Sequence, residues 1–189
     1  MLLLTGVVTT TSVLSGQTAS STRGSSHEVD LALTYTAINN SLSRGGSFWQ
    51  QGGGVELSGE VWRGLGVTAS VTGARASNIT SGVNLTTITT VFGPRYAWTT
   101  SSGKIALFGQ GLIGEAHGLD SVFPSPQGAL SDYISFALQA GGGVDLRLSR
   151  HFAVRAVQAD WLRTQFPNAG TNVQNNLRIS GGLVLRLQR

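Results

Sequence analysis

One segment near the C-terminus reads Phe136-Ala137-Leu138-Gln139-Ala140-Gly141-Gly142-Gly143-Val144-Asp145-Leu146-Arg147-Leu148. Its even-numbered positions are mainly apolar, whereas its odd-numbered positions carry Gln139, Asp145 and Arg147. A two-residue period is typical of a β-strand, because successive side chains point to opposite faces. Strands of soluble sheets usually have about five or six residues, whereas a tilted strand that crosses a bilayer needs about 9–11. The length of this segment therefore favours a membrane-spanning strand.

The composition of the 189-residue chain also fits a membrane β-barrel. Charged residues make up 12% of the sequence, against about 25% in average chains. The sequence has no apolar run of about 18 residues, so it predicts no membrane-spanning helix. The 13 basic residues are scattered singly rather than clustered, and nucleic-acid binding is therefore not expected.

The N-terminal segment has the character of an export signal. An apolar start, Met1–Val8, precedes sequence rich in Ser, Thr, Ala and Gly. We expect a signal-peptide-like segment and a flexible linker over residues 1–26, with cleavage within 16–20, and a barrel over 27–189. A disordered N-terminal tail is the alternative.

Alternating segments recur along the rest of the chain, and eight strands are predicted. They are Val29–Ile38, Gly53–Trp62, Leu65–Ala74, Leu85–Trp98, Lys104–His117, Tyr133–Leu148, Phe152–Phe166 and Asn176–Gln188. Tight turns alternate with longer loops at 39–51, 75–84, 118–132 and 167–175. This layout is typical of an all-β, eight-stranded antiparallel up-and-down transmembrane β-barrel, with both ends of the chain on the short-turn, periplasmic side.

Two of these strands contain irregularities. Pro94 lies within the fourth strand and cannot donate to a ladder, so we expect a bulge there. In the seventh strand Arg155 and Asp160 have opposite parity. One inserted residue near Ala156–Val157 would let both face inward.

With the apolar parity toward lipid, the opposite parity collects five acids and five bases. They are Glu56, Glu60, Glu115, Asp145 and Asp160 together with Arg95, Arg147, Arg155, Arg178 and Arg186. Side chains fill the interior of an eight-stranded barrel, and charges buried there must be paired. We therefore predict an interior Arg/carboxylate network.

Alternation alone is also compatible with a soluble β-sandwich or a lipocalin-like ligand-binding barrel, in which the apolar parity would line the inside. A small porin-like channel is a further alternative. Strand length, low charge and aromatics near the strand ends favour the membrane barrel with a structural or surface-interaction role.

Several motifs resemble one family. They are Phe92-Gly93-Pro94-Arg95-Tyr96, the stretch 108–117, Gly141-Gly142-Gly143-Val144-Asp145 and the stretch 155–161. Over about residues 28–189 the chain resembles the bacterial outer-membrane β-barrel domain family, which includes the membrane domain of outer-membrane protein A and its small relatives.

The resemblance implies an eight-stranded barrel in the bacterial outer membrane, with roles in envelope integrity, adhesion through surface loops, or weak pore formation. The expected partners are outer-membrane lipids and a surface ligand bound by the long loops, and a monomer is expected. The chain ends Leu187-Gln188-Arg189, without the aromatic residue that ends many members. Peptidoglycan anchoring is not implied.

The residues His117, Asp120 and Ser121 lie close together in sequence, and with Glu115 they include types used in catalysis and metal binding. Adjacency in sequence does not establish a catalytic triad, and no ligand-rich repeat occurs. We therefore expect no enzyme activity, no catalytic residue, no cofactor and no metal.

Overall fold

The computed structural model describes residues 28–41, 46–80, 83–125, 128–168 and 172–188. The strands in these ranges are β1 (Glu28–Ser41), β2 (Ser47–Trp62), β3 (Leu65–Thr80), β4 (Val83–Thr99), β5 (Ile105–Leu119), β6 (Phe123–Ser125), β7 (Gly128–Leu130), β8 (Tyr133–Arg147), β9 (Phe152–Thr164) and β10 (Gln174–Gln188). The predicted signal-like segment lies outside the described residues and stays a prediction.

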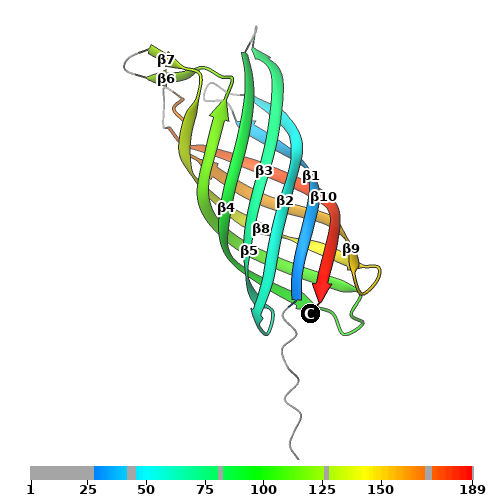
Figure 1. Cartoon of the computed structure of the whole chain (residues 1–189). Helices are drawn as coiled ribbons and strands as arrows, with labels where there is room; N and C mark the ends of the chain where they lie inside the picture. The colour runs from blue at the N-terminus through cyan, green and yellow to red at the C-terminus, as the bar shows by residue number, and fades with distance from the viewer. Residues whose placement is uncertain (1–27, 42–45, 81–82, 126–127, 169–171, 189) are drawn as a thin grey trace, which may run out of the picture.

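Eight of the described strands form one closed barrel in the order β1-β10-β9-β8-β5-β4-β3-β2. Every neighbouring pair is antiparallel, and β1 closes the barrel against β10, for example through Leu33 opposite Leu183. Figure 1 shows β1 starting and β10 ending at the same end of the barrel, the end that also carries the tight turns. The predicted fold class is confirmed.

The tight turn between β2 and β3 shows why the short connections form. Arg63 has a φ of 46° and Gly64 a φ of 84°. Two successive residues with positive φ match the twist of flanking strands in a two-residue hairpin. At Gly64 an added Cβ would lie 2.3 Å from the Ala97 carbonyl oxygen, so glycine also provides the space for this turn.

Most strands extend further than predicted at the long-loop end. The predicted loops at 39–51 and 75–84 are largely strand, since β1 reaches Ser41, β2 begins at Ser47 and β3 reaches Thr80. The predicted loop at 118–132 contains the small β6–β7 hairpin. The Gly, Ser and Asn residues of these segments resemble loop sequence, but ladder hydrogen bonds to neighbouring strands keep the backbone extended.

The two faces of the barrel are inverted relative to a soluble β-barrel. Large apolar side chains such as Leu57, Val67 and Leu183 face outward and are about half exposed, whereas Glu56, Arg155 and Arg178 are buried inside. A lipocalin-like barrel would have the reverse arrangement, so that alternative is wrong. The described residues contain no helix that is long and apolar enough to span a membrane.

The bulge predicted in the seventh strand is confirmed. The β8–β9 register shifts where Val144 pairs with Val157 and Asp145 pairs with Arg155, which leaves Ala156 as the extra residue. Both Arg155 and Asp160 consequently face inward and are buried.

The bulge predicted at Pro94 is wrong. The β3–β4 register runs through Pro94 opposite Val67 without a shift. The β4–β5 ladder omits the pairs at Gly93 and Pro94 and then resumes in the same register at Arg95. Proline has no N–H to donate, and the ladder accommodates it by losing pairs rather than by adding a residue.

Candidate functional site: the barrel interior

The centre of the barrel holds two arginines and two carboxylates in mutual contact. Arg95 Nη1 and Arg155 Nη1 each donate to Glu56 Oε1 at 2.7 Å. Arg155 also binds Asp145 through two hydrogen bonds, Nε to Oδ1 at 2.9 Å and Nη2 to Oδ2 at 3.2 Å. Arg95 Nη2 reaches the same carboxylate at 3.4 Å. This set, the central network, connects β2, β4, β8 and β9 across the lumen.

Neutral side chains complete the central network. Gln110 donates to Glu56 at 3.2 Å, and Gln158 accepts from Arg155 at 2.8 Å. The Phe108 ring lies beside both guanidinium groups, with its centroid 3.7 Å from Arg95 Cζ and 4.5 Å from Arg155 Cζ. Such cation–π contacts are stronger in a desolvated site than at a surface. The buried charges therefore have several hydrogen-bonding or cation–π partners.

A second polar layer lies on the long-loop side of the central network. Arg178 Nε is 3.6 Å from Asp160 Oδ2, and its Nη1 donates to Gln139 at 2.9 Å. Gln158 donates to Asp160 at 2.9 Å and so joins this layer to the central network through Arg155. All five of these residues come from the neighbouring strands β8, β9 and β10.

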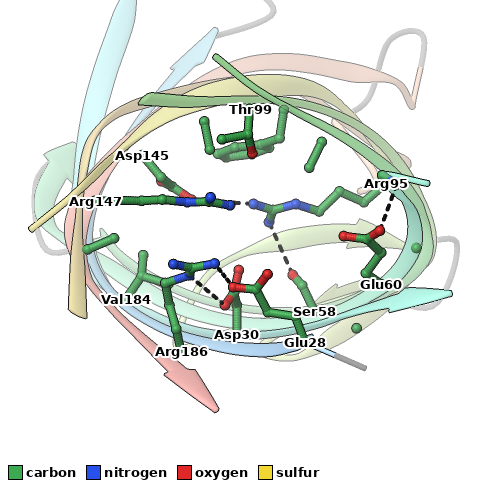
Figure 2. Close-up of a pocket in the computed structure, with 17 residues that line it drawn as sticks. Glu28, Asp30, Ser58, Glu60, Arg95, Thr99, Asp145, Arg147, Val184 and Arg186 are labelled. Carbon is green, nitrogen blue, oxygen red and sulfur yellow. Dashed lines mark hydrogen bonds and ion pairs between the residues drawn. The ribbon is translucent and has the colours of Figure 1, made fainter. Parts of the chain in front are cut away.

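The short-turn mouth contains a third group of charges, shown in Figure 2. Arg186 forms an ion pair with Glu28, and its Nε is 3.7 Å from Asp30 Oδ1. Arg147, which is half-buried, lines the same cavity of about 70 Å³. The cavity has room for only a few water molecules.

Toward the long-loop end, apolar side chains join buried polar ones such as Gln50, Thr87 and Asn176 in the interior. A buried cluster, the apolar plug, fills the lumen there, and its members are Ile38, Ala74, Val91, Leu112, Ala116, Phe123, Ala137, Leu162 and Phe166. Phe123 and Phe166 stack with their ring centroids 5.3 Å apart, and Tyr133 lies 6.0 Å from Phe123. The plug includes Phe123 and Phe166, which lie beyond the ends of β5 and β9 and are buried against the interior side chains.

Two of the predicted interior residues have other environments. Glu60 lies at the short-turn rim, where it is exposed and accepts a hydrogen bond from the Gly64 N–H at 2.9 Å. Glu115 was expected inside, but it shares its parity with the outward-facing Leu107 and Ile113, and its side chain is 57% exposed. The interior assignment of Glu115 is wrong, because the polarity of the side chain rather than its parity guided the choice of face in β5.

Sequence reasoning missed two acids and the neutral partners. Glu28 and Asp30 share the parity of the buried Ala32 and Thr34, so the alternation of β1 could have placed them inside. Phe108 shares the inward parity of Gln110, so the alternation of β5 could have placed it inside as well.

The small residues of β8 leave room for the central network. A methyl group at Gly143 would lie 2.5 Å from the Val157 carbonyl oxygen and 2.7 Å from Cζ of Phe108. We expect Gly143→Ala to lower the free energy of unfolding by about 1–3 kcal/mol, the usual cost of overpacking. Gly73→Ala is the matched control, since no atom lies within 4 Å of its added Cβ; its effect should stay within about 0.5 kcal/mol. Urea titrations in lipid vesicles measure both, and equal values would contradict the packing role.

The residues weighed for catalysis and metal binding do not converge. His117 Nε2 is 3.0 Å from Glu115 Oε1 on the outer face of β5. Asp120 Oδ2 accepts from Thr86 Oγ1 at 3.5 Å, and Ser121 is held through its backbone N–H by Ser131. Among the described residues no group of three or more His, Asp or Glu side chains gathers as a metal site.

No family model and no curated protein matches the chain. Similar solved structures include the following three. Ail, the attachment invasion locus protein of Yersinia pestis, has a TM-score of 0.58 at 16% identity, over 86% of this chain and 99% of that chain. Neisserial surface protein A has a TM-score of 0.58 at 15% identity, over 84% and 96%. OprG of Pseudomonas aeruginosa has a TM-score of 0.50 at 9% identity, over 87% and 97%.

Closure, strand length and an apolar outer face define the class of the protein as a transmembrane β-barrel. Its fold is that of the eight-stranded barrels of bacterial outer membranes. The outer-membrane location expected from the sequence agrees with these neighbours. The short-turn end accordingly corresponds to the periplasmic side.

Proposed function

We propose that the protein is a closed, non-enzymatic outer-membrane barrel that acts through its long-loop end rather than by conducting solutes. The observation that carries the proposal is the double closure of the lumen by the central network and the apolar plug. Ions would have to break buried Arg–carboxylate contacts and then displace the packed side chains of the apolar plug. Both steps are costly, because the charged groups would lose their partners in a medium of low dielectric.

The outward apolar side chains, such as Leu57, Val67 and Leu183, form a band around the barrel that we call the apolar belt. The surface-interaction role is supported by the strands that continue beyond this belt. Arg75 on β3 and Glu115 on β5 face outward near the belt's upper edge, and both strands run on past them. With the β6–β7 pair, these extensions build the described part of the long-loop end from hydrogen-bonded strands. Rigid elements hold binding groups more precisely than loops do.

One neighbour, Ail, was solved with the heparin analogue sucrose octasulfate. A sulfated ligand would need a basic surface on this chain. The described long-loop end carries Arg75 and Arg163 beside the acids Glu115, Asp120 and Asp132. Because acidic side chains outnumber the arginines there, we do not propose a polyanion as the partner of this chain.

Single-channel recording in planar bilayers tests the closed-barrel proposal. We expect the folded protein to insert without stable conductance steps, because the described lumen is sealed at two levels. Protection of the belt from protease confirms insertion in the same preparation. Stable, reproducible steps would overturn the closed barrel in favour of the porin-like alternative.

A further inference from the structure

The long-loop end contains a cavity that the closed-barrel role does not use. Its volume is about 340 Å³, which lies within the range of about 300–1,000 Å³ for small-molecule sites. It lies where the upper ends of β1, β2, β3 and β4 meet the segment before the β6–β7 hairpin and the start of the loop after β9. We call it the mouth cavity.

The mouth cavity is closed toward the lumen. Its lining includes Phe123, a member of the apolar plug, and Leu85, which packs against the plug. The stacked ring of Phe166 lies behind Phe123. A molecule that enters from the long-loop end therefore meets a floor of buried rings, and the cavity is a binding space rather than the entrance of a channel.

The lining of the mouth cavity is apolar with neutral polar groups. Phe48, Val83, Val122 and Pro167 supply apolar surface. Asn40, Ser41, Ser121 and Gln174 supply amide and hydroxyl groups, and none of the described lining residues is charged. Small-molecule sites typically combine apolar walls with a few polar groups that fix orientation. An ionised ligand would lose its hydration without gaining a charged partner.

We propose that the mouth cavity binds a small, neutral, largely apolar molecule with one or two hydrogen-bonding groups, on the scale of a fused aromatic ring. The apolar body packs against Phe123 and Val122. Its polar group bonds to the hydroxyls or amides of the lining. The protein thereby acts as a surface receptor for an uncharged small molecule, a role that rests on the surface-interaction role proposed above and names its ligand class.

Indole is a suitable probe because it is neutral, aromatic and has one N–H donor. The experiment uses the full barrel in lipid nanodiscs with methyl-labelled Val and Leu, and follows methyl chemical shifts as indole is added. We expect saturable shifts at Val83, Leu85 and Val122. Indole dissolved in the lipid would instead shift belt methyls such as Leu57 in proportion to concentration, without saturation. Shifts confined to the belt would overturn the proposal.

Two substitutions and a charged analogue make the test specific. Val122→Trp fills the cavity, and Val61→Trp is its matched control at the opposite end, since the two valines are 58% and 60% exposed. We expect Val122→Trp to raise the indole Kd at least about tenfold, a loss of about 1.4 kcal/mol, and Val61→Trp to leave it unchanged. Indole-3-acetate should bind at least about tenfold more weakly than indole. Unchanged affinity in Val122→Trp, or equal affinity for the anion, would overturn the proposal.

Discussion

Arg155→Ala is expected to lower the free energy of unfolding by about 3–5 kcal/mol, the usual cost of leaving a buried charge without its partner. The Arg155 side chain is 1% exposed and contacts both Glu56 and Asp145. Its removal leaves Arg95 as the one arginine of the central network that still contacts these carboxylates. Urea unfolding in lipid vesicles, followed by tryptophan fluorescence, measures the effect.

The control for this substitution is Arg150→Ala. Arg150 lies in the exposed turn between β8 and β9, and surface substitutions usually change stability by less than about 0.5 kcal/mol. The two variants lose the same charge from the same chain. If both unfold at the same urea concentration, the central network does not stabilise the barrel.

Leu57→Arg is expected to destabilise the folded barrel by about 2–4 kcal/mol, as an arginine does at the lipid face near the bilayer midplane. Leu57 faces outward on β2 between Trp49 and Trp62, two exposed aromatic residues that mark the approximate limits of the belt. The guanidinium group there can reach neither interface without distorting the chain or the lipid. Unfolding free energies in vesicles measure the cost.

Leu148→Arg provides the matched control for depth. Leu148 follows the end of β8 at the short-turn end and is 72% exposed. The same substitution near an interface should cost only about 0–1 kcal/mol. A cost independent of position would show that residues 57 and 148 experience the same solvent, which contradicts a membrane-spanning belt.

The fold could be predicted from the sequence because apolar and polar side chains alternate with a two-residue period along most of the length of each long strand. Strand β10 is the clearest example, since Leu177, Ile179 and Leu183 face outward and Arg178 faces inward as the alternation predicts. The parity conflict in β9 even located the bulge at Ala156. At Glu115 the polarity of the side chain suggested an inward position, whereas its parity placed it outward, and parity was correct. A charged side chain can face outward there because β5 continues beyond the part of the barrel that contacts lipid.

The arrangement inside the barrel was predictable only in part. Parity selects the inward side chains, but partners depend on register and on the tilt of the strands. Arg155 bonds Glu56, a residue 99 positions away in the sequence, and no local pattern encodes that contact. The apolar plug escaped prediction for a different reason: Leu112 and Leu162 share the inward parity of Gln110 and Asp160, but only charged residues were assigned to the interior.

A cysteine scan along the outer face of β3 tests the membrane-spanning arrangement most directly. The chain has no cysteine, so single substitutions at Val67, Ala69, Val71, Gly73 and Arg75 each give one site for a spin label. All five side-chain positions face outward and are exposed, so labels there leave the interior intact. Accessibility to oxygen, relative to a polar nickel reagent, should rise to a maximum in the middle of the series and fall toward Arg75. A flat profile with high accessibility to the nickel reagent at every site would contradict the transmembrane barrel.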